Sequence, residues 1–160
     1  MKKVFLNNFL FYFLLIILLI FFGYLRDFLF VNINSQLDKL NNKASFSELS
    51  PKLSFITNFS YRQLYIGKWG LTLLFIFIYF ILSQVLIKKM FKEKKFLTWT
   101  SYSFLIIIVI SSLFYVYGVV FNDYERGYAL SRVFMGMMQS PFVLMVLIPA
   151  FKLSKSHTKI

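Results

Sequence analysis

Residues 4–25 read VFLNNFLFYFLLIILLIFFGYL, and they are the first of four long apolar runs in this 160-residue chain. The other three extend from Trp69 to Ile87, from Phe96 to Val120 and from Ala129 to Phe151. A helix needs about 20 apolar residues to cross the hydrocarbon core of a bilayer. Because every run comes near or above that length, we predict an all-α integral membrane protein. We expect a bundle of four helical spans that forms one domain over residues 1–160.

The composition favours a membrane protein over a soluble one. Hydrophobic residues make up 59% of the chain, and the net charge is +12. In a soluble domain such a basic excess points to nucleic acid. Here the apolar content makes membrane topology and anionic headgroups the better explanation for the lysines. We therefore expect membrane lipids and other inner-membrane proteins as partners, and no nucleic acid.

The sequence holds no pattern typical of catalysis, of a metal site or of a cofactor site. It contains no cysteine and one histidine, His157, close to the C-terminus. A catalytic triad or a histidine-ligated haem needs a histidine in the folded body, whereas terminal residues are usually solvated. Asp123 and Glu125 are two acids in a loop, too few for a metal site without further ligands. We expect a protein that is not an enzyme and that binds no cofactor.

The distribution of lysine predicts the orientation in the membrane. Lys2 and Lys3 precede the first span, five lysines lie in the turn 88–95, and three more follow the fourth span. Short segments rich in lysine are typical of the cytoplasmic side. We therefore expect two helical hairpins with both termini in the cytoplasm, and Arg26 and Asp27 on the outer side. The turn is expected to contact anionic lipid through Lys88, Lys89, Lys92, Lys94 and Lys95.

The segment 26–68 is the only sizeable part outside the predicted spans. Apolar residues recur in it at spacings of three and four, which is a one-sided helical pattern. This amphipathic docking stripe comprises Phe30, Ile33, Leu37, Leu40, Phe46, Leu49, Leu53 and Ile56. Ser45 and Glu48 fit a capping box, Pro51 marks the start or a bend of the second piece, and Ser60 is a favourable N-cap for the second span.

Two interpretations of this amphipathic segment stay open. It either rests in the lipid headgroups or docks a partner, because two consecutive stripes exceed what a connector requires. The first helix either projects from the membrane beyond Arg26 or bends there to follow the surface.

The fourth run differs from the others because it carries polar residues. Arg132 and Gln139 are seven residues apart, so a helix places them on one face with Gly136 close to it. The candidate seam or partner contact comprises Arg132, Gly136, Gln139, Asp123, Glu125 and Arg126. One interpretation is a polar pocket or contact site that opens outward. The other is an ion pair and a kink at Pro141 that tie the fourth helix to the third, and the frequency of structural ion pairs favours it.

Three parts of the last helix carry a family resemblance: Leu130–Phe134, Gln139–Pro141 and Ile148–Phe151. They resemble the C-terminal end of the small membrane proteins associated with the exosortase F system of Bacteroidota. Those proteins look like four-span proteins with an arginine early in the last helix, a glutamine and a proline midway, and a closing Pro-Ala-Phe. This chain has one arginine where they have a pair, and its 26–68 segment is longer. The resemblance implies a non-catalytic accessory protein of the inner membrane in envelope protein sorting.

We therefore predict a multi-pass protein of the bacterial inner (cytoplasmic) membrane. The expected function is that of a non-enzymatic accessory or scaffold subunit of a larger complex, in envelope protein sorting or secretion. The alternative is a small transporter, channel or lipid-handling protein that uses the polar seam of the fourth helix.

Overall fold

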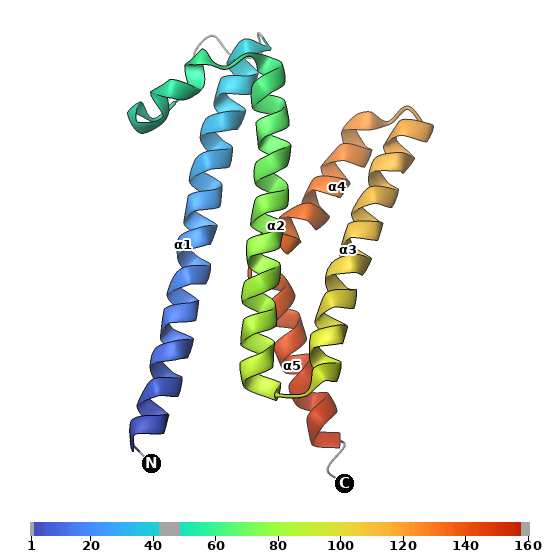
Figure 1. Ribbon diagram of the computed structural model, residues 1–160. Helices are drawn as coiled ribbons and strands as arrows, with labels where there is room; N and C mark the ends of the chain where they lie inside the picture. The colour runs from blue at the N-terminus through green and yellow to red at the C-terminus, as the bar shows by residue number, and fades with distance from the viewer. Residues whose placement is uncertain (1, 42–48, 158–160) are drawn as a thin grey trace. The chain divides into compact units, whose positions relative to one another are not determined.

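The computed structural model describes residues 2–41 and 49–157, and helices make up nearly all of them (Figure 1). The elements are α1 (Lys2–Leu40), the 3-10 helix η1 (Pro51–Asn58), α2 (Tyr61–Phe91), α3 (Lys94–Val120), α4 (Tyr124–Met138) and α5 (Phe142–His157). No strand occurs in the described ranges. The prediction of an all-α protein is confirmed. The predicted capping box of Ser45 and Glu48 lies outside the described residues.

Three of these helices are long and apolar enough to cross a membrane: α1 from Phe9 onward, α2 and α3. The bent pair of α4 and α5 adds a fourth candidate if it is counted as one span. Large apolar side chains, among them Phe9, Leu74 and Ile106, are exposed along these helices. Soluble monomers rarely expose continuous apolar surface on this scale. The chain is therefore a multi-pass membrane protein.

The first helix is longer than a bilayer requires. α1 has 39 residues and runs through Arg26 to Leu40 as one helix, which corresponds to about 58 Å at 1.5 Å per residue. The hydrocarbon core is about 30 Å thick. Of the two alternatives for this segment, the continuous helix is the one observed.

The predicted span Ala129–Phe151 consists of two helices. α4 ends at Met138, α5 begins at Phe142, and the two are bent by 60°. Pro141 explains the break, because it has no N–H to donate to the carbonyl of Met137 and its ring crowds that turn. The hydroxyl of Ser140 donates to the Met137 carbonyl instead, at 2.9 Å. The kink predicted at Pro141 is confirmed.

The chain divides into two compact units. The first contains the chain up to Leu19 and from Ile76 onward, and the second contains Ile20–Phe75. In the first unit, Phe104 of α3, Met138 of α4 and Val143 of α5 form a buried cluster beside the break. The break therefore lies against the apolar core of this unit.

Small residues let the backbones of α3 and α4 come into direct contact. A Cβ atom on Gly127 would contact the Gly118 Cα, and it would lie 2.7 Å from the Gly118 nitrogen. Further along the same pair, the Ser111 hydroxyl donates to the Ser131 carbonyl at 3.0 Å. Small and hydroxyl-bearing residues are typical of helix contacts in membranes, where close packing replaces the hydrophobic effect. Asp123 begins α4 as its N-cap by accepting from the Arg126 N–H.

The start of α2 agrees with the prediction for Ser60. Its hydroxyl accepts from the Gln63 N–H at 3.4 Å, while the Gln63 side chain accepts from the Ser60 N–H at 2.9 Å. This reciprocal pair is a capping box. At the other end of α2, Lys92 has a φ of 58° and its N–H donates to the Lys88 carbonyl, so the helix ends in a left-handed cap.

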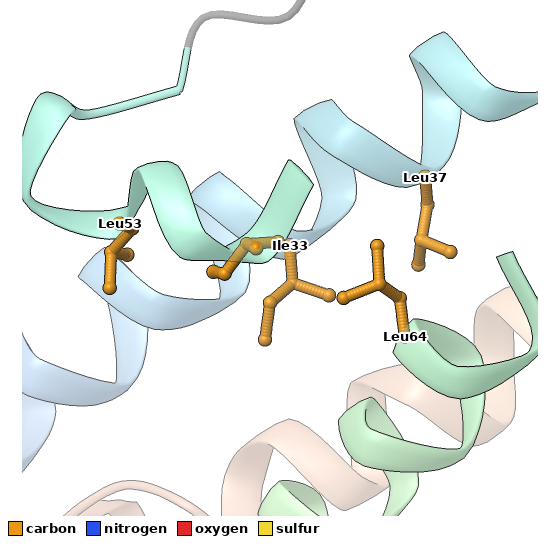
Figure 2. Close-up of a cluster of buried hydrophobic side chains, with 5 residues drawn as sticks. Ile33, Leu37, Leu53 and Leu64 are labelled. Carbon is orange, nitrogen blue, oxygen red and sulfur yellow. The ribbon is translucent and has the colours of Figure 1, made fainter. Parts of the chain in front are cut away.

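The second unit has its own core (Figure 2). Ile33 and Leu37 of α1 pack with Leu53 of η1 and Leu64 of α2 in one buried cluster, which also contains Ile56. η1 begins at Pro51, as one of the two alternatives for that proline predicted. The side chain of Asn32 accepts from the Ser50 N–H at 2.7 Å and so holds the start of η1 against α1.

Most residues of the predicted docking stripe thus pack against other parts of the same chain. Its buried members Ile33, Leu37, Leu53 and Ile56 contact one another, and Leu49 packs against them half-buried. Phe30 packs against Phe75 of α2, with ring centroids 6.2 Å apart. Leu40 is exposed, and Phe46 lies outside the described residues. A partner that docked on this stripe would have to displace the cluster.

We predict that Gly127→Ala destabilises the protein by about 1–3 kcal/mol, because the added methyl group meets the backbone of α3, which cannot rotate away. Gly70→Ala is the matched control, since nothing lies within 4 Å of its Cβ position. It should be neutral or raise stability by up to about 1 kcal/mol, the usual gain of alanine over glycine in a helix. Unfolding of both variants in detergent, followed by circular dichroism, measures the difference. Equal stabilities would contradict the close α3–α4 contact.

Candidate functional site

The structure separates the residues of the predicted polar seam. Arg126 Nη1 lies 3.6 Å from Asp123 Oδ2, and both flank the first turn of α4. Glu125 is exposed in that same turn. These charged residues are a helix cap with one ion pair, and they lie apart from the break at the other end of α4 (Figure 1).

Arg132 and Gln139 differ in exposure. Arg132 is exposed, and its guanidinium lies over the Tyr128 ring, 5.8 Å from the centroid. Gln139 is 3% exposed at the break, where its N–H donates to the carbonyl of Gly136. Among the described residues, no ion pair involves Arg132. Gln139 is the C-cap of α4, and its N–H also donates to the Met135 carbonyl at 3.3 Å. The two side chains therefore differ in their surroundings, one exposed and one buried.

The buried polar contacts of the first unit join helices of this chain. Gln84 of α2 donates to the Leu97 carbonyl and to the Ser101 hydroxyl of α3, at 3.2 and 2.9 Å. Ser111 bonds Ser131 across the α3–α4 contact. The pairing of Gly118 with Gly127 was not predicted from the sequence. The spacing of Gly127 and Ser131, four residues apart, was the available signal, since such pairs mark close helix contacts.

One end of the first unit is rich in lysine. In Figure 1 the start of α1, the α2–α3 turn and the end of α5 lie together at the bottom of the view. Glu93 joins the turn to α5, because its carboxylate lies 3.0 Å from Lys95 Nζ and 3.7 Å from Lys155 Nζ. The rings of Phe91, Phe96 and Phe151 meet beside it. The predicted lipid-contact lysines are all exposed at this end: Lys88, Lys89, Lys92, Lys94 and Lys95.

An apolar groove of about 700 Å³ lies between α1, α2 and α5 within the first unit. Its lining consists of Tyr12, Leu15, Ile16, Leu19, Leu86, Met90, Pro141, Leu144, Met145, Ile148 and Pro149. The groove begins at the helix break, and Met90 marks its opposite end next to the lysines. Tyr12 supplies the one side-chain hydroxyl of this lining.

An ion pair lies in the middle of α1. Arg26 Nη1 is 3.3 Å from Asp27 Oδ1, and the Asp27 side chain is 71% exposed. The Arg26 guanidinium also lies 5.9 Å from the Phe30 ring centroid. Because Phe30 packs on Phe75, this ion pair lies beside the central part of α2 and not beside its first turns.

The described residues hold no group of three or more His, Cys, Asp or Glu side chains that could bind a metal. Comparisons with protein-family models, with curated proteins and with solved structures find no match for this chain.

We predict a pH-dependent contribution of Glu93 to stability. The hydrogen bond from Lys95 lowers the pKa of the Glu93 carboxyl below its ordinary value of 4.5, and the charge of Lys155 acts in the same direction. A depressed folded pKa contributes stability above the unfolded pKa, and that contribution is lost as the pH falls through the folded pKa. Glu93→Gln should therefore show a smaller loss of stability than the wild type on acidification below about pH 5.

The effect should be small because Glu93 is solvent-exposed, and salt should reduce it. Glu125→Gln is the control, since Glu125 is an exposed acid with no ion pair in the described part of the chain. Thermal unfolding in detergent over the acidic range compares the three proteins. Identical pH profiles for the wild type and Glu93→Gln would contradict the prediction.

Proposed function

We propose that this protein is a non-enzymatic accessory subunit of a larger complex in the bacterial inner membrane. In this proposal α1, α2, α3 and the bent pair α4–α5 are its four spans, and both termini face the cytoplasm. The resemblance of the last helix to proteins of the exosortase F system points to envelope protein sorting or secretion as the setting.

The lysine-rich end supports the proposed orientation. The ion pair of Glu93 with Lys155 holds the α2–α3 turn and the end of α5 together, and Lys89 Nζ lies over the Phe11 ring of α1 at 5.4 Å. Lysine from separate segments therefore gathers at one end of the first unit. Such a concentration is typical of the cytoplasmic side of a bacterial inner membrane.

The argument for a partner starts from the register between α1 and α2, which gives the depth of Arg26 and Asp27 in the membrane. The apolar stretch of α2 lies between Lys68 and Lys88, about 30 Å apart along the helix, which matches one hydrocarbon core. Trp69 lies at the outer boundary, and Leu64 lies five residues before it. Leu64 packs with Ile33 and Leu37 of the antiparallel α1, which lie seven and eleven residues past Arg26. At 1.5 Å per residue, Arg26 and Asp27 then lie roughly 2–9 Å below that boundary.

In this proposed placement Arg26 and Asp27 lie just inside the outer boundary, whereas the sequence led us to expect them on the outer side. An ionised side chain costs at least about 2.5–3.5 kcal/mol at the centre of a bilayer, and less towards the interface where Arg26 and Asp27 lie. Arg26 offsets part of that cost, but Asp27 is 71% exposed on the surface of α1. Charged groups at such depth almost always face a protein interior or pair with another polar group. A transmembrane helix of a partner, with a hydrogen-bond donor or a basic residue at matching depth, would provide that environment.

The alternative of a transporter, channel or lipid-handling protein depended on the polar seam of the fourth helix. Since Arg132 is exposed and Gln139 is buried at the break, the described structure offers no single polar face for that purpose. The geometry therefore supports the accessory subunit better.

The depth of Asp27 is testable by cysteine labelling, because the natural chain contains no cysteine. We predict that Asp27→Cys in purified protein in phosphatidylcholine vesicles resists a membrane-impermeant maleimide applied on both sides. Asp38→Cys should react readily. Asp38 lies eleven residues further on the same face of α1 and is exposed, so the pair differs mainly in depth. Equal labelling rates would place Asp27 in water and remove this argument for a partner.

We predict that the wild-type protein, extracted from its native membranes in mild detergent, migrates as a discrete complex with another protein in fixed stoichiometry. Asp27→Ala should lose that protein, whereas Asp38→Ala should keep it. Size-exclusion chromatography with light scattering and mass spectrometry measures the composition. A wild-type monomer or homo-oligomer would contradict the proposed function. Retention of the partner by Asp27→Ala would leave the accessory function standing and overturn the contact at Asp27.

A further inference from the structure

The groove between α1, α2 and α5 has the dimensions of a ligand site. Its volume of about 700 Å³ lies within the range of about 300–1,000 Å³ typical of small-molecule sites. On α5 it extends over nine residues, from Pro141 to Pro149, which is about 12 Å along a helix axis. It is therefore long enough to hold a substantial part of a hydrocarbon chain.

The lining favours a hydrocarbon chain over a transmembrane helix. Helices that pack closely in membranes bring small residues together, as Gly118 and Gly127 do in this chain. The groove is walled by bulky side chains such as Leu15, Leu86 and Ile148, and it contains no glycine, alanine or serine. A flexible acyl chain can follow such a surface, whereas a helix backbone cannot come close to it.

The mouth of the groove carries positive charge. Lys89 precedes the lining residue Met90, and its Nζ lies 5.4 Å from the centroid of Phe11, the neighbour of the lining residue Tyr12. Lys152 is exposed one helical turn past the lining residue Ile148, so it lies on the same side of α5. Two ammonium groups from different helices thus stand at the end of the groove that faces the lysine-rich turn.

The one acid in the α2–α3 turn does not cancel this charge. Glu93 pairs with Lys95 and Lys155, while the ion pairs of the described chain include neither Lys89 nor Lys152. The local field at the groove mouth is therefore positive. It would attract a phosphate located where the apolar lining ends.

We infer that the groove binds one anionic phospholipid, with an acyl chain along α5 towards Pro141 and its phosphate between Lys89 and Lys152. The inference is independent of the proposed partner, because the groove lies within the first unit and Asp27 within the second. The helix break contributes to the site, since Pro141 forms part of its wall.

Native mass spectrometry of the purified full-length protein, titrated with phosphatidylglycerol or phosphatidylcholine of identical acyl chains, tests the site. Phosphatidylglycerol should bind at least tenfold more tightly, because each basic residue near a headgroup contributes about fivefold. Lys89→Gln should lower the affinity for phosphatidylglycerol about fivefold and leave the affinity for phosphatidylcholine unchanged. Lys94→Gln is the matched control, an exposed lysine of the same end that does not adjoin the groove, and it should have little effect.

A second pair of variants tests the groove without disturbing the core. Met145 lines the groove and is 71% exposed, so Met145→Trp should fill it and reduce binding of phosphatidylglycerol at least tenfold. Val146→Trp places the same ring on the next exposed position, outside the lining, and it should bind as the wild type does. Thermal unfolding of both variants confirms that they remain folded.

Four results would overturn the inference. Equal affinity for the two lipids would remove the role of the lysines. Unchanged binding in Met145→Trp would show that the lipid lies elsewhere on the surface. Competition by inorganic phosphate alone, without any dependence on acyl chains, would mean that the lysines bind a free anion and that the groove is not used. Loss of a co-purifying protein in Met145→Trp, with lipid binding intact, would instead assign the groove to a partner helix.

Discussion

The structure depends on the absence of water from the hydrocarbon core, which forces every polar group there to find a partner within the protein. The long apolar helices meet that requirement for their backbones. The side chains follow the same rule: Tyr79 donates to the Leu19 carbonyl at 3.0 Å, and Thr100 donates to the Phe96 carbonyl at 2.8 Å. Where a backbone bond is lost, at Pro141, the hydroxyl of Ser140 replaces it. The polar residues of the spans thus serve first to hold helices.

The break in the last span has two consequences for the first unit. It buries Gln139 as the C-cap of α4, and it turns α5 by 60° relative to α4. Because α4 remains tied to α3 through Gly118 and Gly127, α5 follows its own direction beside the parts of α1 and α2 that belong to this unit. The groove lies along that direction. One proline therefore accounts both for the bend of the last span and for part of the wall of an apolar site.

Charged side chains have different surroundings in the two units. At the lysine-rich end of the first unit, solvated ammonium groups surround a single carboxylate, an arrangement suited to anionic headgroups. In the second unit, Arg26 and Asp27 form an ion pair within an apolar helix. A charged side chain costs little free energy at the solvated lysine-rich end. In the middle of α1, in the proposed membrane placement, it costs more, because transfer away from water penalises a charge that is incompletely paired. That contrast is why the lysines suggest a lipid and Asp27 suggests a protein partner.

The sequence by itself determined the helical class, the membrane location and the capping residue Ser60, because apolar run length and local hydrogen bonding are properties of short segments. It also located Pro141 as a kink. It could not determine that Gly118 meets Gly127, that the stripe around Ile33 and Leu37 closes on Leu53 and Leu64, or which part of α1 lies beside α2. These features depend on the register between segments far apart in the chain, which periodicity within one segment does not encode. Only the tertiary structure decided them, and with them the existence of the groove.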